Sequence, residues 1–183
     1  MAANDKRMFY KYLDTASKYF ECGSGGSTYA ASCRSNIVRI VSIESDKDWY
    51  KAVKAAVPRA EVHLVDLHSV PNTWGRPGSS CPATAQKQYS DLLLEVKDPH
   101  EFDLILIDGR YRVACCLKAF RTIRDDCVVI FDDFLDRPAY HIVLDYYKVI
   151  ESTSDNRMVV LKKRVDVDAP STALIEKYEC DPF

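Results

Sequence analysis

The chain has 183 residues, of which 47% are hydrophobic and 28% are charged, the proportions of an ordinary globular protein with one sizeable core. A formal net charge of −2 gives no electrostatic reason to expect binding to nucleic acid or to an anionic membrane. No apolar run is long enough to span a membrane, and residues 1–7 lack a signal-peptide core, so we expect a single cytoplasmic domain over residues 1–183.

Hydrophobic periodicity predicts strands alternating with helices from residue 18 to residue 146, preceded by an N-terminal helix within residues 1–17. The expected strands are 18–22, 38–43, 61–65, 102–107 and 127–131, and the expected helices are 27–35, 46–57, 84–96, 111–123 and 137–146. Residues 147–151 and 157–163 predict a closing hairpin, and residues 166–183 predict a loosely held tail. This alternation indicates an α/β fold with a mostly parallel sheet covered by helices on both faces.

The seven cysteines are odd in number, and none of them forms a C-x-x-C pair. They are therefore predicted to be reduced thiols of a cytosolic-type protein, and neither a disulfide framework nor a zinc site is expected.

A glycine-rich loop follows the first predicted strand and leads into a helix. Three of the six glycines fall within four positions, at Gly23, Gly25 and Gly26. Bare backbone at such a turn can approach a ligand closely, although an ordinary turn that opens a core helix would look similar. Residue 28 is Thr where the dinucleotide fingerprint needs a third glycine, and Glu21 would repel a pyrophosphate. A nucleoside with an amino-acid tail, such as S-adenosylmethionine, fits better than a nicotinamide dinucleotide.

Each of the five predicted parallel strands ends in a carboxylate. Ligands of such sheets bind outside the carboxyl ends of the strands, so these side chains are expected to meet at one edge. Such a concentration of acidic groups favours a cationic or polyhydroxyl ligand. The residues are Glu21, Glu44, Asp66, Asp108 and Asp132.

These motifs resemble those of class I S-adenosylmethionine-dependent methyltransferases over essentially the full chain. The first motif is residues 21–27, and the fourth is residues 106–109. A narrower likeness is to a small branch with a W-G-x-P segment at residues 74–77 and a D-G-R-[FY]-R-V-A-C motif at residues 108–115. The resemblance implies a Rossmann-like sheet of seven strands whose last strand is antiparallel.

The resemblance also implies a donor site for S-adenosylmethionine, with S-adenosylhomocysteine as product. Gly23, Ser24 and Gly25 would pass beneath the methionine part, with Glu21 at its amino group. Glu44 would accept hydrogen bonds from both ribose hydroxyls. The remaining expected donor contacts are Ser27, Ser45, Asp66, Leu67 and Asp108.

The expected catalytic residues are His141, as general base, with Asp108 and Asp133. Asp108, Asp132 and Asp133 could together hold a divalent cation such as magnesium or manganese, as in metal-dependent O-methyltransferases. The alternatives are that the aspartates cap a turn or pair with neighbouring arginines, and that His141 is structural.

The acceptor is expected near the fourth and fifth strand ends. Arg110 and Arg112 could clamp a phosphate or carboxylate, or they could pair with the aspartates. Tyr111 would add an aromatic wall to the acceptor site, and Trp74 would serve as a lid or a stacking platform. Tyr140 is next to His141 in the chain, so on a helix only one of the two is expected to face the site.

The sequence thus predicts an O-methyltransferase acting on a sugar, a glycan or another small molecule. Methylation of protein or nucleic acid and a non-catalytic S-adenosylmethionine-binding module remain alternatives, with nucleic acid disfavoured by the net charge. A membrane partner is not expected, and a homodimer is compatible with the sequence.

Overall fold

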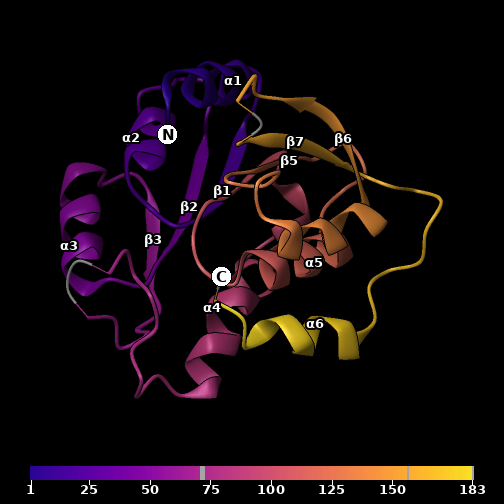
Figure 1. The fold of residues 1–183 in the computed structure, drawn as a ribbon. Coiled ribbons are helices and arrows are strands. Elements are labelled where there is room, and N and C mark those ends of the chain that lie inside the picture. Colours follow the sequence, from indigo (N-terminus) through magenta and orange to yellow (C-terminus); the bar gives the residue numbers. More distant parts are fainter. Residues whose placement is uncertain (71–72, 156, 183) are drawn as a thin grey trace.

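The computed structural model describes residues 1–70, 73–155 and 157–182. The remaining residues lie outside the described part. They fall between the predicted strand 61–65 and the predicted helix 84–96, in the turn of the predicted hairpin, and at the end of the predicted tail. A seven-stranded sheet runs through the molecule in the order β3-β2-β1-β4-β5-β7-β6 (Figure 1). The strands are β1 (Lys18–Cys22), β2 (Arg39–Glu44), β3 (Glu61–Leu64), β4 (Leu104–Ile107), β5 (Val128–Phe131), β6 (Tyr147–Ser152) and β7 (Val159–Lys163).

The pairing of the strands confirms the predicted Rossmann-like sheet. Strands β1 to β5 pair in parallel, and β7 is antiparallel to both β5 and β6. All four residues of β4 are buried, as expected of a central strand covered on both faces.

Alternate residues of the central strands serve two separate cores, one on each face of the sheet. Tyr19 and Leu104 pack in one core, whereas the next residue of each strand, Phe20 and Ile105, packs in the other. This is the two-residue period of a strand with no solvent-exposed face.

Two groups of helices cover these two faces (Figure 1). The core that contains Tyr19 is covered by α1, α2 and α3, and the core that contains Phe20 is covered by α4, α5, α6 and η2. None of the helices in the described ranges is long and apolar enough to cross a membrane. The helices are α1 (Ala3–Leu13), α2 (Gly26–Ser32), α3 (Lys47–Ala56), α4 (Ala83–Glu95), α5 (Arg112–Thr122) and α6 (Thr172–Glu179), with 3-10 turns η1 (Pro99–Glu101) and η2 (Pro138–Asp145).

Residues 137–146, predicted as an α-helix, form the 3-10 helix η2 instead. The backbone N–H of Tyr140 donates to the carbonyl of Arg137, and that of Tyr146 donates to the carbonyl of Val143, both three residues back. Pro138 occupies the first turn, where proline is tolerated, and β6 begins at Tyr147 directly after the segment.

The prediction of a loose C-terminal tail is wrong, because residues 172–179 form α6 and dock on α5. Ile175 is 4% exposed in the core beneath α4 and α5. The Nζ of Lys118, whose side chain is 4% exposed, lies 2.5 Å from Glu179 and 2.6 Å from Asp91. Burial alone would raise the pKa of the Glu179 carboxyl, but hydrogen bonds from Lys118 and Lys87 hold it below its usual value. An acidic residue on α6 thus anchors the tail to a buried lysine.

We expect Lys118→Met to destabilise the protein by about 3 kcal/mol, because it leaves two largely buried carboxylates without their buried cation. Lys87 contacts the same two carboxylates but is 58% exposed, so Lys87→Met is the matched control and should cost less than about 1 kcal/mol. Urea unfolding measures both. Equal losses for the two variants would contradict the anchoring role of Lys118.

Candidate functional site

A cleft of about 1680 Å³ opens at the carboxyl ends of the parallel strands. The loops that follow β1 to β5 all contribute to its lining, because strands paired in parallel end at the same edge. The lining includes five consecutive residues of the glycine loop, 23–27. It also includes a group of charged residues from the segments after β4 and β5 and before β7, which are Asp108, Asp132, Asp133, Arg110, Arg112, Arg137 and Arg157.

The glycine loop is closely packed against the loop that follows β4. Gly23 has φ +92°, a conformation that favours glycine, and a Cβ there would lie 2.9 Å from the Cα of Gly109. Its N–H donates to the carbonyl of Ile43 at 3.0 Å, which ties the loop to β2. The two glycines allow the ends of β1 and β4 to meet with no side chain between them.

Glu21 does not line the cleft, so its predicted contact with the donor's amino group is not supported. It is fully buried and accepts hydrogen bonds from the hydroxyls of Tyr19 (2.7 Å), Thr28 and Ser42. Burial raises the pKa of this carboxyl. Thr28 Oγ1 also accepts from the N–H of Gly25 at 2.8 Å, so the Glu21 network fixes the shape of the glycine loop from behind.

Glu44 lies at the cleft as predicted, at the end of β2. One carboxylate oxygen accepts from the backbone N–H groups of Ser45 (2.7 Å) and Asp46 (2.9 Å), and the other accepts from Ser24 Oγ at 2.6 Å. Ser45 Oγ donates to the carbonyl of Gly75 at 3.1 Å. This contact holds the loop after β3 beside Glu44.

Two tryptophans line the same end of the cleft. Trp49 Nε1 donates to the carbonyl of Ser24 at 2.9 Å, and its ring would lie 3.4 Å from a Cβ on Gly25. Trp49 was not predicted, although the N-cap Asp46 puts the first turn of α3 at the same edge as Glu44. Trp74, which was predicted, is 88% exposed on the loop after β3.

Asp66 lines the cleft, but Leu67 does not. The Asp66 carboxylate lies 2.6 Å from Lys47 Nζ, and hydrogen bonds from Lys47 and from the N–H of His68 lower its pKa. The Leu67 side chain is fully buried in the core, which does not support its predicted border with the adenine.

Asp108 and Asp132 form a carboxyl pair inside the cleft. Asp132 is 4% exposed, and its Oδ1 is one of the buried polar side-chain atoms in the described residues with no hydrogen-bond partner. Burial, the neighbouring charges of Asp108 and Asp133, and a hydrogen bond with Asp108 raise the pKa of Asp132 to about 7. Burial also raises the pKa of Asp108. Neighbouring buried carboxyls oppose each other's ionisation, which explains why both pKa values are raised.

Asp133, next in the chain, is in a different electrostatic environment. Its carboxylate lies 2.8 Å from Arg137, 2.6 Å from Arg157 and 3.7 Å from Arg112. Burial favours its neutral form, but a hydrogen bond from Arg157 and the surrounding guanidinium charges lower its pKa overall. A carboxylate held by three arginines is a poor proton acceptor.

The predicted divalent cation site is not formed. Among the residues that the structure describes, no group of three or more His, Cys, Asp or Glu side chains is arranged to hold a metal ion. The arginine contacts of Asp133 account for this, since its oxygens already have cationic partners. Asp108, Asp132 and Asp133 share the cleft but do not act as a ligand set.

Arg112 is 4% exposed and ties the strand ends together. Its guanidinium donates to the carbonyls of Gly109 (2.9 Å), Asp132 (2.6 Å) and Asp108 (3.1 Å), and it pairs with the Asp108 carboxylate at 3.2 Å. For Arg112 the pairing alternative is therefore the correct one. Arg110 also lines the cleft but makes no such contacts.

Three further predicted residues, besides Glu21 and Leu67, do not line the cleft. Tyr111 is fully buried and packs on Tyr89 with ring centroids 5.8 Å apart, so it gives no wall to an acceptor. Tyr140 is 2% exposed against Phe131. His141 stacks on Phe134, and its buried Nε2 has no partner in the described residues. The 3-10 geometry of η2 turns both of its predicted site residues into the protein, so His141 is not placed to act as a base.

Arg157 and Arg137 were not predicted. Arg157 comes from the turn region before β7, 24 residues after its partner Asp133, and no local sequence signal indicates this contact. Arg137 follows Asp133 by four residues. This spacing predicts an ion pair only if the two side chains are known to lie on the same face of the segment.

No family model and no curated protein matches the sequence. Solved structures do match. A methyltransferase-like protein from Silicibacter pomeroyi has 25% sequence identity and a TM-score of 0.84, with 100% of this chain and 96% of that chain covered. A TehB-like S-adenosylmethionine-dependent methyltransferase from Corynebacterium glutamicum is 12% identical with a TM-score of 0.56, over 88% of both chains.

An RNA methyltransferase from Salinibacter ruber, solved with S-adenosyl-L-homocysteine, is 14% identical with a TM-score of 0.54, over 93% of this chain and 99% of that chain. The strand order, the antiparallel β7 and these similarities agree on the architecture. The chain has the Rossmann-like fold of class I S-adenosylmethionine-dependent methyltransferases.

Proposed function

We propose that this protein transfers a methyl group from S-adenosylmethionine to a hydroxyl of a sugar, a glycan or another small molecule. The observation that carries the proposal is the Asp108–Asp132 carboxyl pair, which shares one cleft with the glycine loop and Glu44. In this proposal, the donor site and a proton acceptor of suitable pKa would lie at the same sheet edge.

The residues of the cleft fit the donor. The loop at residues 23–27 presents backbone and small side chains, so the methionine part can pass close to the chain. The Glu44 carboxylate is fixed by two backbone N–H groups and retains acceptor capacity for the ribose hydroxyls. Trp49 and Trp74 offer exposed aromatic faces near the same end.

Methyl transfer needs alignment of the acceptor and removal of its proton. S-adenosylmethionine supplies the methyl group on a positively charged sulfur and leaves as S-adenosylhomocysteine. The Asp132 carboxylate would take the hydroxyl proton, because Asp132 lines the cleft and a base with a pKa of about 7 is half ionised at neutral pH. This assigns to Asp132 the role that the sequence analysis gave to His141.

RNA or protein as acceptor is the competing proposal. The arginines in the cleft would suit RNA as well as a small anion, whereas the low net charge does not favour a long nucleic acid. Labelled S-adenosylmethionine offered with sugars, sugar acids, bulk RNA and a protein extract separates these acceptors, and a chelator should leave the rate unchanged. Donor binding without transfer to any class would favour the non-catalytic module.

Glu44→Gln should weaken S-adenosylhomocysteine binding by about 10-fold or more, because the amide loses the charge that strengthens hydrogen bonds from the ribose. Calorimetric titration measures the affinity. Asp48→Asn is the control, since Asp48 also borders the cleft but its side chain is 89% exposed and pairs only with Lys51 in the described residues. Unchanged affinity in Glu44→Gln would remove the ribose assignment.

A further inference from the structure

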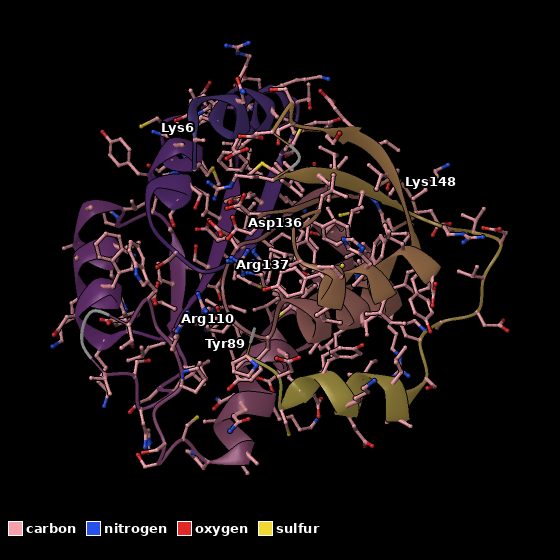
Figure 2. The ribbon with its side chains drawn as sticks, viewed as in Figure 1. Lys6, Tyr89, Arg110, Asp136, Arg137 and Lys148 are labelled. Carbon is pink, nitrogen blue, oxygen red and sulfur yellow. The ribbon has the colours of Figure 1, made fainter. Side chains whose placement is uncertain are left out.

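Arg110 occupies a fixed position between β4 and α5. Its backbone N–H donates to Tyr89 Oη at 3.2 Å, and its carbonyl accepts from Cys115 Sγ at 3.6 Å. Tyr89 is 1% exposed and anchored in the core. Figure 2 shows Arg110 beside Tyr89, with Arg137 nearer the centre of the molecule, and both arginines line the cleft. The base of the Arg110 side chain is therefore held rigidly at the cleft.

The Arg110 guanidinium has no hydrogen bond or ion pair with any residue of the described ranges. The other arginines on this side differ: Arg112 donates to three carbonyls, and Arg137 and Arg157 pair with Asp133. Arg110 is half-buried, and the loss of solvent lowers its pKa, with a further contribution from the charges of Arg112 and Arg76. Keeping a guanidinium with five N–H donors half-buried and without a hydrogen-bond partner costs free energy unless an anion binds it.

The carboxylates of the cleft do not supply the missing anion. Asp133 is held by three arginines and Asp108 by Arg112. Four arginines face three aspartates on this side, and Asp132 is neutral for part of the time near pH 7. This side of the cleft has an excess of positive charge that the protein itself does not neutralise.

We propose that the acceptor carries an oxyanion group, a carboxylate or a phosphate, which binds the Arg110 guanidinium. Guanidinium forks bind both groups through two parallel hydrogen bonds, which fix orientation as well as position. With the anion on Arg110, an adjoining hydroxyl can be presented to Asp132 across the same cleft. This inference rests on the proposed methyl transfer and narrows its substrate to hydroxylated acids or phosphate esters.

The test is an NMR titration of the full chain with inorganic phosphate and, separately, acetate, with and without S-adenosylhomocysteine. We expect saturable binding that shifts the Arg110 side-chain signal and weakens by roughly 10-fold or more in Arg110→Ala, since a charge-assisted hydrogen bond is lost. Arg110→Lys should keep part of the affinity. Arg124→Ala, which removes an exposed arginine paired with Asp126, is the control and should bind as the parent does.

Tighter binding of phosphate or of acetate identifies which oxyanion the site prefers. Absence of saturable binding of both ions to the parent protein, or equal binding by Arg110→Ala, would overturn the proposal. Because the titration without S-adenosylhomocysteine reports on Arg110 alone, it separates this outcome from a failure of the methyltransferase proposal, which would appear as no S-adenosylhomocysteine binding.

Discussion

Gly109→Ala is expected to destabilise the protein by about 3 kcal/mol or more, the largest stability effect that the site predicts. A Cβ on Gly109 would lie 2.1 Å from Tyr89 Oη and 2.9 Å from both the carbonyl carbon of Cys22 and the nitrogen of Gly23. Two of these neighbours are backbone atoms of the β1 strand end, which hydrogen bonds hold to β2 and β4. Urea unfolding of the purified variant measures the loss.

Gly26→Ala is the matched control for this prediction. Gly26 also lines the cleft, but a Cβ there would meet nothing within 4 Å. Its stability should stay within about 0.5 kcal/mol of the parent or rise slightly, because alanine is the better helix former. If both substitutions have the same small effect, the close approach of the β1 and β4 loops is not as described.

Asp132→Asn should lower turnover by about 100-fold to 10,000-fold at saturating donor, because an amide cannot accept the hydroxyl proton. The affinity for S-adenosylhomocysteine should change little, since Glu44 and the glycine loop are untouched. The parent enzyme should gain kcat/KM as pH rises through about 7, where Asp132 ionises. Full activity of Asp132→Asn, or a rate that does not change around pH 7, would remove Asp132 as the base.

The same substitution should stabilise the folded protein at alkaline pH. The Asp132 pKa is raised from 3.8 to about 7 on folding, so the folded state holds a proton that the unfolded chain loses between these two values. The stabilising contribution of this group is present below pH 4, falls as pH rises and is lost above pH 7. Asparagine does not ionise, so the variant should exceed the parent by roughly 2–4 kcal/mol at pH 8 and by much less at pH 4.

Asp133→Asn should have the opposite effect on stability. The Asp133 pKa is lowered, so its ionised form contributes stability at neutral pH, and that contribution is lost as pH falls through its folded-state pKa. Thermal unfolding at pH 8 should rank the proteins as Asp132→Asn above parent and parent above Asp133→Asn. The reverse order would contradict the assignment of a raised pKa to Asp132 and a lowered pKa to Asp133.

The fold was largely predictable because its signal is local. Apolar runs such as residues 104–107 stand between turn residues, and their alternation with helices leaves few arrangements besides a parallel sheet. The tail was not predictable in this way. The contacts of α6 depend on Lys118 and Arg121, about 50 to 60 residues earlier in the chain, and on a buried charge that composition does not reveal.

The cleft positions of Glu44 and the glycine loop were predicted correctly, whereas those of His141 and Tyr140 were not. Glu44 and the glycine loop follow strand ends directly, so strand prediction alone places them at the cleft. His141 and Tyr140 lie further from their strand, where a 3-10 helix rather than an α-helix changes which way side chains face. The raised pKa of Asp132 depends on its burial and on the charge of Asp108, which follows the neighbouring strand β4 and not β5.

The central claim is that S-adenosylmethionine binds across the glycine loop with its ribose at Glu44. A crystal structure of the protein grown with saturating S-adenosylhomocysteine tests it most directly. We predict the ribose hydroxyls on the Glu44 carboxylate and the amino-acid end over residues 23–27, on the side of the cleft that faces Asp132. An unoccupied cleft under those conditions, or a nucleoside bound elsewhere on the molecule, would contradict the proposed function.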